Sequence, residues 1–146
     1  MKNIWLIGLL ILALCLSLAA CGGSDGDPDA VNVNTVEGKL ALLGLSEQDL
    51  LLDAQDSIEI DEDGDLTVHS VASYEEVAKA VYDACAKAAD DGVVRDSVSQ
   101  EPAAFEFAET ILHFGYSCGG VFRNVTITPI WSDQETGVTD YLLRWE

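Results

Sequence analysis

The chain has 146 residues, of which 26 are Asp or Glu and 7 are Lys or Arg, so its formal net charge at pH 7 is −19. An acidic surface of this size excludes nucleic acid as a partner and excludes electrostatic docking on anionic lipid, because both of these are themselves negative. The chain is long enough to bury one core and too short for two ordinary domains after a leader segment.

The amino terminus has the pattern of an export signal. Lys2 supplies a positive charge, and residues 4–18 are apolar apart from Gly8 and Ser17. A basic start, an apolar stretch of roughly 7 to 15 residues and small residues before a cut are typical of secretory signals. The stretch is short for a membrane span, which needs about 20 apolar residues. We therefore expect residues 1–20 to be a cleaved signal peptide.

A four-residue motif ends this segment: Leu18-Ala19-Ala20-Cys21. It resembles the lipobox of bacterial lipoproteins, which is Leu, a small residue, Ala or Gly, and then Cys, and it matches at all four places. In that class a diacylglyceryl group is attached to the Cys thiol, and a dedicated peptidase cuts before the Cys. The resemblance implies that Cys21 is the first residue of the mature protein and its lipid anchor.

Two other interpretations of the segment stay open, an uncleaved anchor helix and an ordinary secretory cut that leaves Cys21 free. Gly22 stands where Asp would favour inner-membrane retention in double-membrane bacteria, so the resemblance points to the outer membrane if the cell has one. We expect the protein to be lipid-anchored to a cell membrane or outer membrane on the extracytoplasmic face.

A tether follows the anchor. Residues 22–30 contain no large apolar side chain, so they cannot offset their ordering entropy by burial. Residues 21–30 are therefore expected to be the lipidated Cys and a flexible Gly/Asp tether. With no repeat or further linker, residues 31–146 are expected to be one domain.

Short elements open this domain. Gly44 is typical of a helix end. Ser46, followed by the acids Glu47 and Asp49, is typical of a helix start. The pattern predicts short helices at 36–43 and 47–53.

A hairpin is predicted next. Residues 57–60 and 66–71 alternate and are rich in β-branched side chains, with Asp63-Gly64 as the turn between them. Alternating acids in this turn copy the first ligand positions of a calcium loop. That loop needs Gly at its sixth position and Glu at its twelfth, where Leu66 and Ala72 stand. We predict a plain hairpin and no metal site.

The longest predicted helix covers about 73–91. Ser73 and Glu76 form a capping box, apolar residues then recur at helical spacing, and Gly92 ends the pattern. The apolar stripe consists mostly of small residues, so this helix can approach a sheet closely.

Three strands are predicted after a polar connection at 95–102. They lie at about 112–117, 121–131 and 141–145. Strands separated by one long helix predict an α+β fold. It is expected to have two layers, a mainly antiparallel sheet of about five strands and the helix at 73–91, with short N-terminal helices.

No catalytic residue is predicted. Neither His69 nor His113 stands in a metal-ligand or nucleophile pattern, and no phosphate-binding or dinucleotide motif is present. His69 and Ser70 with an acid could be imagined as a triad, but adjacency in sequence does not direct a Ser hydroxyl at an imidazole. No cofactor is expected.

Two cysteines remain in the predicted domain, Cys85 and Cys118. An even pair in an oxidising or extracellular compartment predicts a disulfide. The alternative has Cys85 as a small buried residue and Cys118 as a turn residue.

Taken together, these patterns predict a surface-exposed lipoprotein whose domain is a binding or envelope-structural module. Its partners would be the membrane, through the lipid on Cys21, and an unknown protein or envelope ligand. The alternative is a hydrolase of envelope polymers that uses carboxylates as acid and base. A cleft with two acids of divergent pKa would favour the enzyme, whereas an exposed aromatic patch would favour the binding module.

Overall fold

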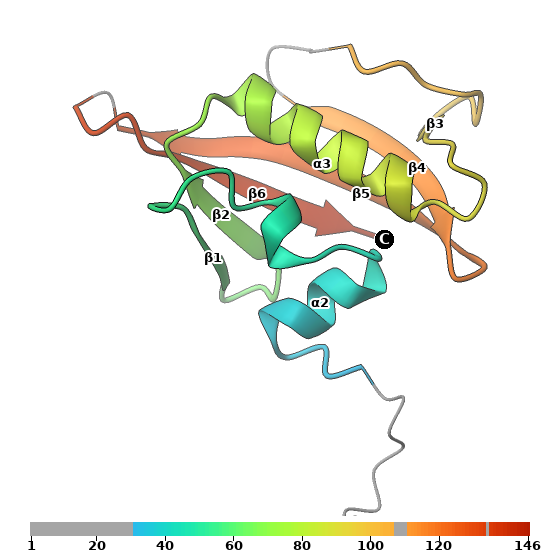
Figure 1. Ribbon diagram of the computed structural model, residues 1–146, viewed down its shortest axis with the longest axis horizontal. Coiled ribbons are helices and arrows are strands. Elements are labelled where there is room, and N and C mark those ends of the chain that lie inside the picture. The colour runs from blue at the N-terminus through green and yellow to red at the C-terminus, as the bar shows by residue number, and fades with distance from the viewer. Residues whose placement is uncertain (1–30, 107–110, 134) are drawn as a thin grey trace, which may run out of the picture. The chain divides into compact units, whose positions relative to one another are not determined.

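The computed structural model describes residues 31–106, 111–133 and 135–146 (Figure 1). The expectations for the signal peptide, for Cys21 and for the tether concern residues 1–30, which lie outside the described residues. The part from Val31 to Glu146 forms one compact unit.

Helix α2 spans Val36–Leu42, and the 3-10 turn η1 spans Glu47–Asp49. Thr35 caps α2 by accepting the backbone N–H of Gly38, as an N-cap residue does. The helix expected at 47–53 is wrong beyond this single turn. At the end of the predicted helix, the backbone N–H groups of residues 52 and 53 donate to the carboxylate of Asp56. This side chain thus replaces the carbonyl acceptors that a helix would provide.

The predicted hairpin is present. Strand β1 (Ser57–Ile60) pairs antiparallel with β2 (Leu66–Ser70), and Ile60 lies opposite Leu66. In the turn, the carboxylate of Asp61 accepts the backbone N–H groups of residues 63 and 65, both at 2.9 Å. Gly64 has φ +86°, the left-handed conformation that glycine adopts without strain.

Helix α3 spans Tyr74–Ala88 and begins with the expected capping box of Ser73 and Glu76. It ends three residues before the predicted end. At Asp90 the backbone N–H donates to the carbonyl of Ser117, and the carboxylate accepts two more N–H groups from the turn at 119–120. These contacts turn the chain towards the sheet.

The remaining strands are β3 (Arg95–Asp96), β4 (Leu112–Cys118), β5 (Val121–Ser132) and β6 (Thr139–Trp145). The six strands of the described residues form one sheet in the order β1-β2-β6-β5-β4-β3, with every neighbouring pair antiparallel. The fold is α+β and mostly sheet. The sixth strand, β3, lies in the segment expected to be a polar connection. The sequence did not predict it because two residues are too few to show an alternating pattern.

One face of the sheet, which we call the helix face, holds the core. Successive side chains of a strand point to opposite faces, and those on the helix face pack with α3 and α2 in one buried cluster. In Figure 1 α3 runs along the sheet next to β4 and β5. The strand residues of this face are Leu66, Val68, Phe114, Tyr116, Val125, Ile127, Tyr141 and Leu143.

Buried tyrosines fasten the helices and loops to this face. The hydroxyl of Tyr116 donates to the carbonyl of Leu43 at 2.6 Å, and that of Tyr141 donates to the carbonyl of Ala72 at 2.7 Å. Each side chain thus buries a large apolar surface while its polar atom is satisfied.

Candidate binding face of the sheet

The opposite side of the sheet, which we call the open face, carries polar side chains in cross-strand rows. Residues paired across antiparallel strands share a face and lie within contact distance. One row runs from Trp131 through Asp140 and His69 to Ser57. Another runs from His113 through Thr126 to Arg144. These side chains are exposed or half-buried, in contrast to their buried neighbours on the helix face.

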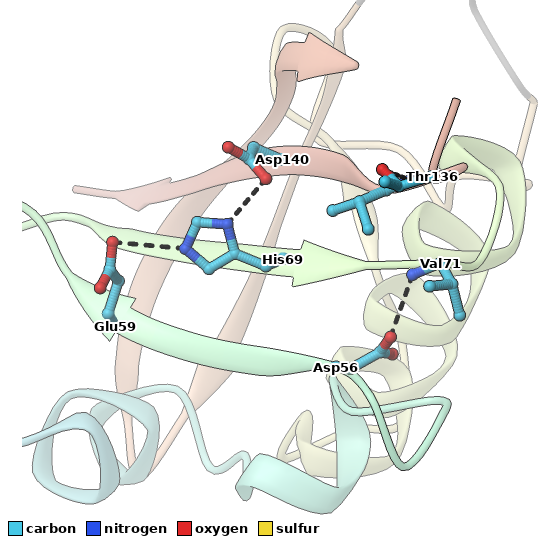
Figure 2. A network of polar contacts seen from close by, with 7 residues as sticks. Asp56, Glu59, His69, Val71, Thr136 and Asp140 are labelled. Atoms are coloured by element: carbon cyan, nitrogen blue, oxygen red, sulfur yellow. Dashed lines mark hydrogen bonds and ion pairs between the residues drawn. The ribbon is translucent and has the colours of Figure 1, made fainter. Parts of the chain in front are cut away.

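His69 lies between two carboxylates, as Figure 2 shows. Its Nδ1 is 2.7 Å from Oδ1 of Asp140 on β6, and its Nε2 is 3.3 Å from Oε1 of Glu59 on β1. Partial burial of the ring opposes its charged form, but the hydrogen bonds to Asp140 and Glu59 outweigh it and raise the pKa of His69. Because a carboxylate only accepts hydrogen bonds, the protonated ring can donate to both partners and link three strands.

Ser70 does not belong to this group. It is buried on the helix face, so its side chain and that of His69 point to opposite sides of the sheet. Its hydroxyl donates to Oδ2 of Asp56 at 2.8 Å. The imagined triad of His69, Ser70 and an acid is therefore not assembled.

Asp56 holds the end of β2 to the loop before β1. Besides Ser70, its carboxylate accepts the backbone N–H of Val71 at 3.1 Å (Figure 2) and those of residues 52 and 53. Burial raises the pKa of this carboxyl, but the hydrogen bonds from Ser70 and the backbone outweigh it and lower the pKa overall. This carboxylate is occupied by structural contacts.

A depression of about 480 Å³ lies over β4, β5 and β6 on the open face. Its polar lining includes His113, Asn124, Thr126, Thr128, Arg144 and Glu146. His113 Nδ1 is 3.0 Å from Oγ1 of Thr126, and Nε of Arg144 donates to Oδ2 of Asp65 at 2.5 Å. The hydrogen bond to Asp65 raises the pKa of the Arg144 guanidinium.

Exposed aromatic rings stand at both ends of β5. Trp131 is 54% exposed and lies opposite Asp140, just after a register shift in β5. Phe122 is 39% exposed and covers Gly115, where a Cβ atom would lie 2.4 Å from its ring. Both rings lie on the open face but at opposite ends of β5, so they do not form the single aromatic patch expected of a binding module.

The disulfide expected between Cys85 and Cys118 is not formed, and both thiols are free. Cys85 is buried in the core, and its burial raises the pKa of its thiol to about 12. Cys118 packs beneath Gly44, where a Cβ atom would lie 2.8 Å from its Sγ. The correction has a physical reason: both sulfurs are used as packing atoms, as free cysteines in protein cores commonly are.

Several carboxyl groups have a pKa that departs from its ordinary value, and in each the shift is downward. In all of them the hydrogen bonds from backbone or side-chain donors lower the pKa by more than burial raises it. They are Asp56, Glu76, Asp91, Asp96 and Asp133. A carboxyl that acts as a general acid near neutral pH needs the opposite shift.

Within the described residues, no group of three or more His, Cys, Asp or Glu side chains is placed to hold a metal ion. None of the helices in the described part is long and apolar enough to cross a membrane. The chain matches no protein-family model, no curated protein and no solved structure.

The sequence drew attention to His69 and His113 but missed their partners. Glu59 lies across the β1–β2 hairpin from His69, ten positions away. Asp140 comes from β6, which only the strand order brings beside β2. The alternation of Thr126 and Thr128 with buried residues was the signal that could have placed a polar face on β5.

Proposed function

We propose that the protein is a lipid-anchored lipoprotein of the cell envelope whose domain binds an envelope ligand through the open face. The lipobox-like motif ending at Cys21 supports the anchor. Because the net charge is negative, the protein would not be attracted electrostatically to anionic lipid, which favours attachment through a covalent lipid. The observation that carries the binding role is the open face itself.

The two faces of the sheet present different side chains. Those of the helix face pack in the buried core, where Nε of Arg123 is buried without a hydrogen-bond partner among the described residues. The open face instead presents polar groups around a depression, with aromatic rings at the ends of β5. Concave sites with a few convergent polar groups are where proteins bind small ligands. Six antiparallel strands give these groups a rigid floor.

The alternative, a hydrolase of envelope polymers, has less support. Its general acid would need a carboxyl with a raised pKa, and the resolved shifts are downward. Glu59 and Asp140 flank an imidazole, so the ring fills the space that a scissile bond would need.

We also propose that the fold has two layers. We take the sheet as one layer and α3, as the one long helix, as the main part of the second. This arrangement leaves the open face free for a ligand.

The binding role is tested with the full chain and isolated cell-envelope fractions. Thr128→Arg places a long charged side chain in the depression, and Asn34→Arg places the same side chain on an exposed residue before α2. Labelled protein is bound to the envelope fraction, and unlabelled protein is added as competitor to measure the saturable part of the binding. We expect this saturable binding to be equal for the wild type and Asn34→Arg and to be lost for Thr128→Arg. Equal saturable retention of all three, or saturable retention of none, would refute the role.

The anchor is tested separately. The mature protein should lack residues 1–20 and carry an acyl-glyceryl mass on Cys21. Each buried CH₂ contributes about 0.8 kcal/mol, so two or three acyl chains hold the protein on the membrane. The Cys21→Ser variant should therefore be absent from the membrane fraction. A secreted wild-type protein with a free thiol at Cys21 would refute the proposed lipid anchor.

A further inference from the structure

The two edges of the sheet are finished differently. At one edge, β3 is covered by the chain that follows it. The backbone N–H of Asp96 donates to the carbonyl of Glu101 at 3.0 Å, and the N–H of Ala103 donates to the carbonyl of Val94 at 2.9 Å. Pro102 forms a bridge with β3 and has no N–H group to offer a further strand. This edge is therefore closed by the protein itself.

The other edge is β1, and no described strand lies beyond it (Figure 1). In the hairpin, the N–H of Asp61 donates to the carbonyl of Asp65 at 2.9 Å. Because hydrogen-bonded pairs alternate along an antiparallel ladder, Glu59 also bonds to β2, whereas the backbone groups of Ile58 and Ile60 point away from β2. These N–H and C=O groups have no hydrogen-bond partner within the described part of the chain.

The side chains at this edge decide what strand would fit. Ile58 and Ile60 pack against the core on the helix face, whereas Glu59 lies on the open face with its side chain 66% exposed. Residues 56–63 contain five acids and no Lys or Arg. Two copies of β1 paired at their edges would bring these acids together, so self-pairing is unfavourable. The same acids would attract a basic strand.

We propose that β1 binds an extended basic segment of a partner protein as an added strand. In strand addition, backbone hydrogen bonds hold the peptide and its alternate side chains give specificity. Residues that bond to Ile58 and Ile60 place their side chains beside these two on the helix face, so they should be apolar. The residue between them faces Glu59 on the open face, so it should be Lys or Arg. The segment therefore alternates apolar and basic residues.

This inference goes beyond the binding role of the open face and does not rest on it. The depression lies over β4, β5 and β6, whereas the docking edge is the outer side of β1. The formal net charge of −19 also favours a basic partner, because opposite charges raise the rate of encounter.

The experiment measures amide hydrogen exchange by NMR on the full chain in a non-ionic detergent. The probe is a short capped peptide that alternates Val and Lys. Three peptides are compared with it, one with Glu in place of Lys, one N-methylated at the valines and one N-methylated at the lysines. The protein variants are Glu59→Lys, the milder Glu59→Gln, and Glu101→Lys, which makes the same charge reversal at an exposed residue of the β3 edge.

In the free protein, we expect the amides of Ile58 and Ile60 to exchange faster than that of Glu59, which is bonded to β2. The Val–Lys peptide should slow exchange at Ile58 and Ile60 by at least about tenfold, because opening then requires its release. Methyl groups on the valines remove the donors that face β1 and should abolish binding, whereas methyl groups on the lysines point outward and should be tolerated.

The charge variants test the choice of partner. Glu59→Lys should weaken binding of the Val–Lys peptide by about tenfold, because an attraction across the ladder becomes a repulsion. Glu59→Gln should weaken it less, and Glu101→Lys should change it by less than about twofold because the reversed charge lies at the opposite edge.

Protection of Ile58 and Ile60 already in the free chain would show that the edge is covered, and this would overturn the inference. The inference also falls if the Val–Lys peptide does not bind or leaves their exchange unchanged. Equal binding of the peptide that contains Glu, or equal binding by Glu59→Lys and Glu101→Lys, would refute the basic partner.

Discussion

The two faces of the sheet are built from alternate residues of the same strands, yet they have opposite properties. On β4, Phe114 is 1% exposed and packs against Tyr82 of α3, whereas its neighbour His113 is exposed on the open face. On β6, Tyr141 is buried and Asp140 contacts His69. Because successive side chains of a strand point to opposite faces, the core residues and the residues of the proposed binding face are different ones. Substitutions on the open face should therefore leave the core intact.

The largest expected difference between the two faces is tested by truncating two neighbouring residues on one strand. Phe114→Ala opens a cavity in the core and should lower the free energy of unfolding by about 3–5 kcal/mol. His113→Ala removes an exposed side chain with one hydrogen bond and should cost less than about 1 kcal/mol. Urea denaturation measures both, and similar costs would show that the open face also carries the fold.

A second test uses the carboxylate that holds the end of β2. Asp56→Ala leaves four donors without their acceptor and should cost about 2 kcal/mol, whereas Asp53→Ala, which loses one exposed backbone contact, should cost under about 1 kcal/mol.

The pH dependence of the Asp56 contribution follows from its lowered pKa. The stabilisation is present above the ordinary Asp value of 3.8 and is lost as the pH falls through the lower folded value. The gap between wild type and Asp56→Ala should therefore narrow below pH 3.8. A gap that widens on acidification would contradict the assignment.

The smallest expected effect concerns His69. Its pKa is raised in the folded state, so its stabilisation is complete below the ordinary value of 6.5 and is lost as the pH rises through the folded value. Comparison of wild type with His69→Gln from pH 5 to 9 should show an excess stability of under about 1 kcal/mol that fades above pH 6.5. An excess that grows above that pH would have the wrong sign.

Local signals in the sequence predict much of the helix side of the fold. The capping box at Ser73 and Glu76 places the start of α3, and Asp63-Gly64 places the β1–β2 turn. The end of α3 was not predictable, because the chain leaves the helix through contacts of Asp90 with the turn at 119–120. Local pattern gives elements, and long-range contacts fix their ends.

The candidate site depended almost entirely on strand order. Strand β6 ends the sequence but lies between β2 and β5, which brings Asp140 to His69 and Arg144 to Thr126. No spacing rule connects residues 71 positions apart, such as His69 and Asp140. The disulfide prediction failed for the same reason, because an even number of cysteines does not determine where their thiols pack in the fold.

The most direct test of a ligand-binding open face is covalent footprinting of the full chain in native envelopes and after extraction into detergent, read by peptide mass spectrometry. We predict that Trp131 and the segment at 124–128 are labelled less in native envelopes, while the exposed outer residues of α3, Lys79 and Asp83, are labelled equally in both states. Equal labelling of Trp131 and 124–128 in both states, or protection of the outer side of α3 instead, would contradict the account.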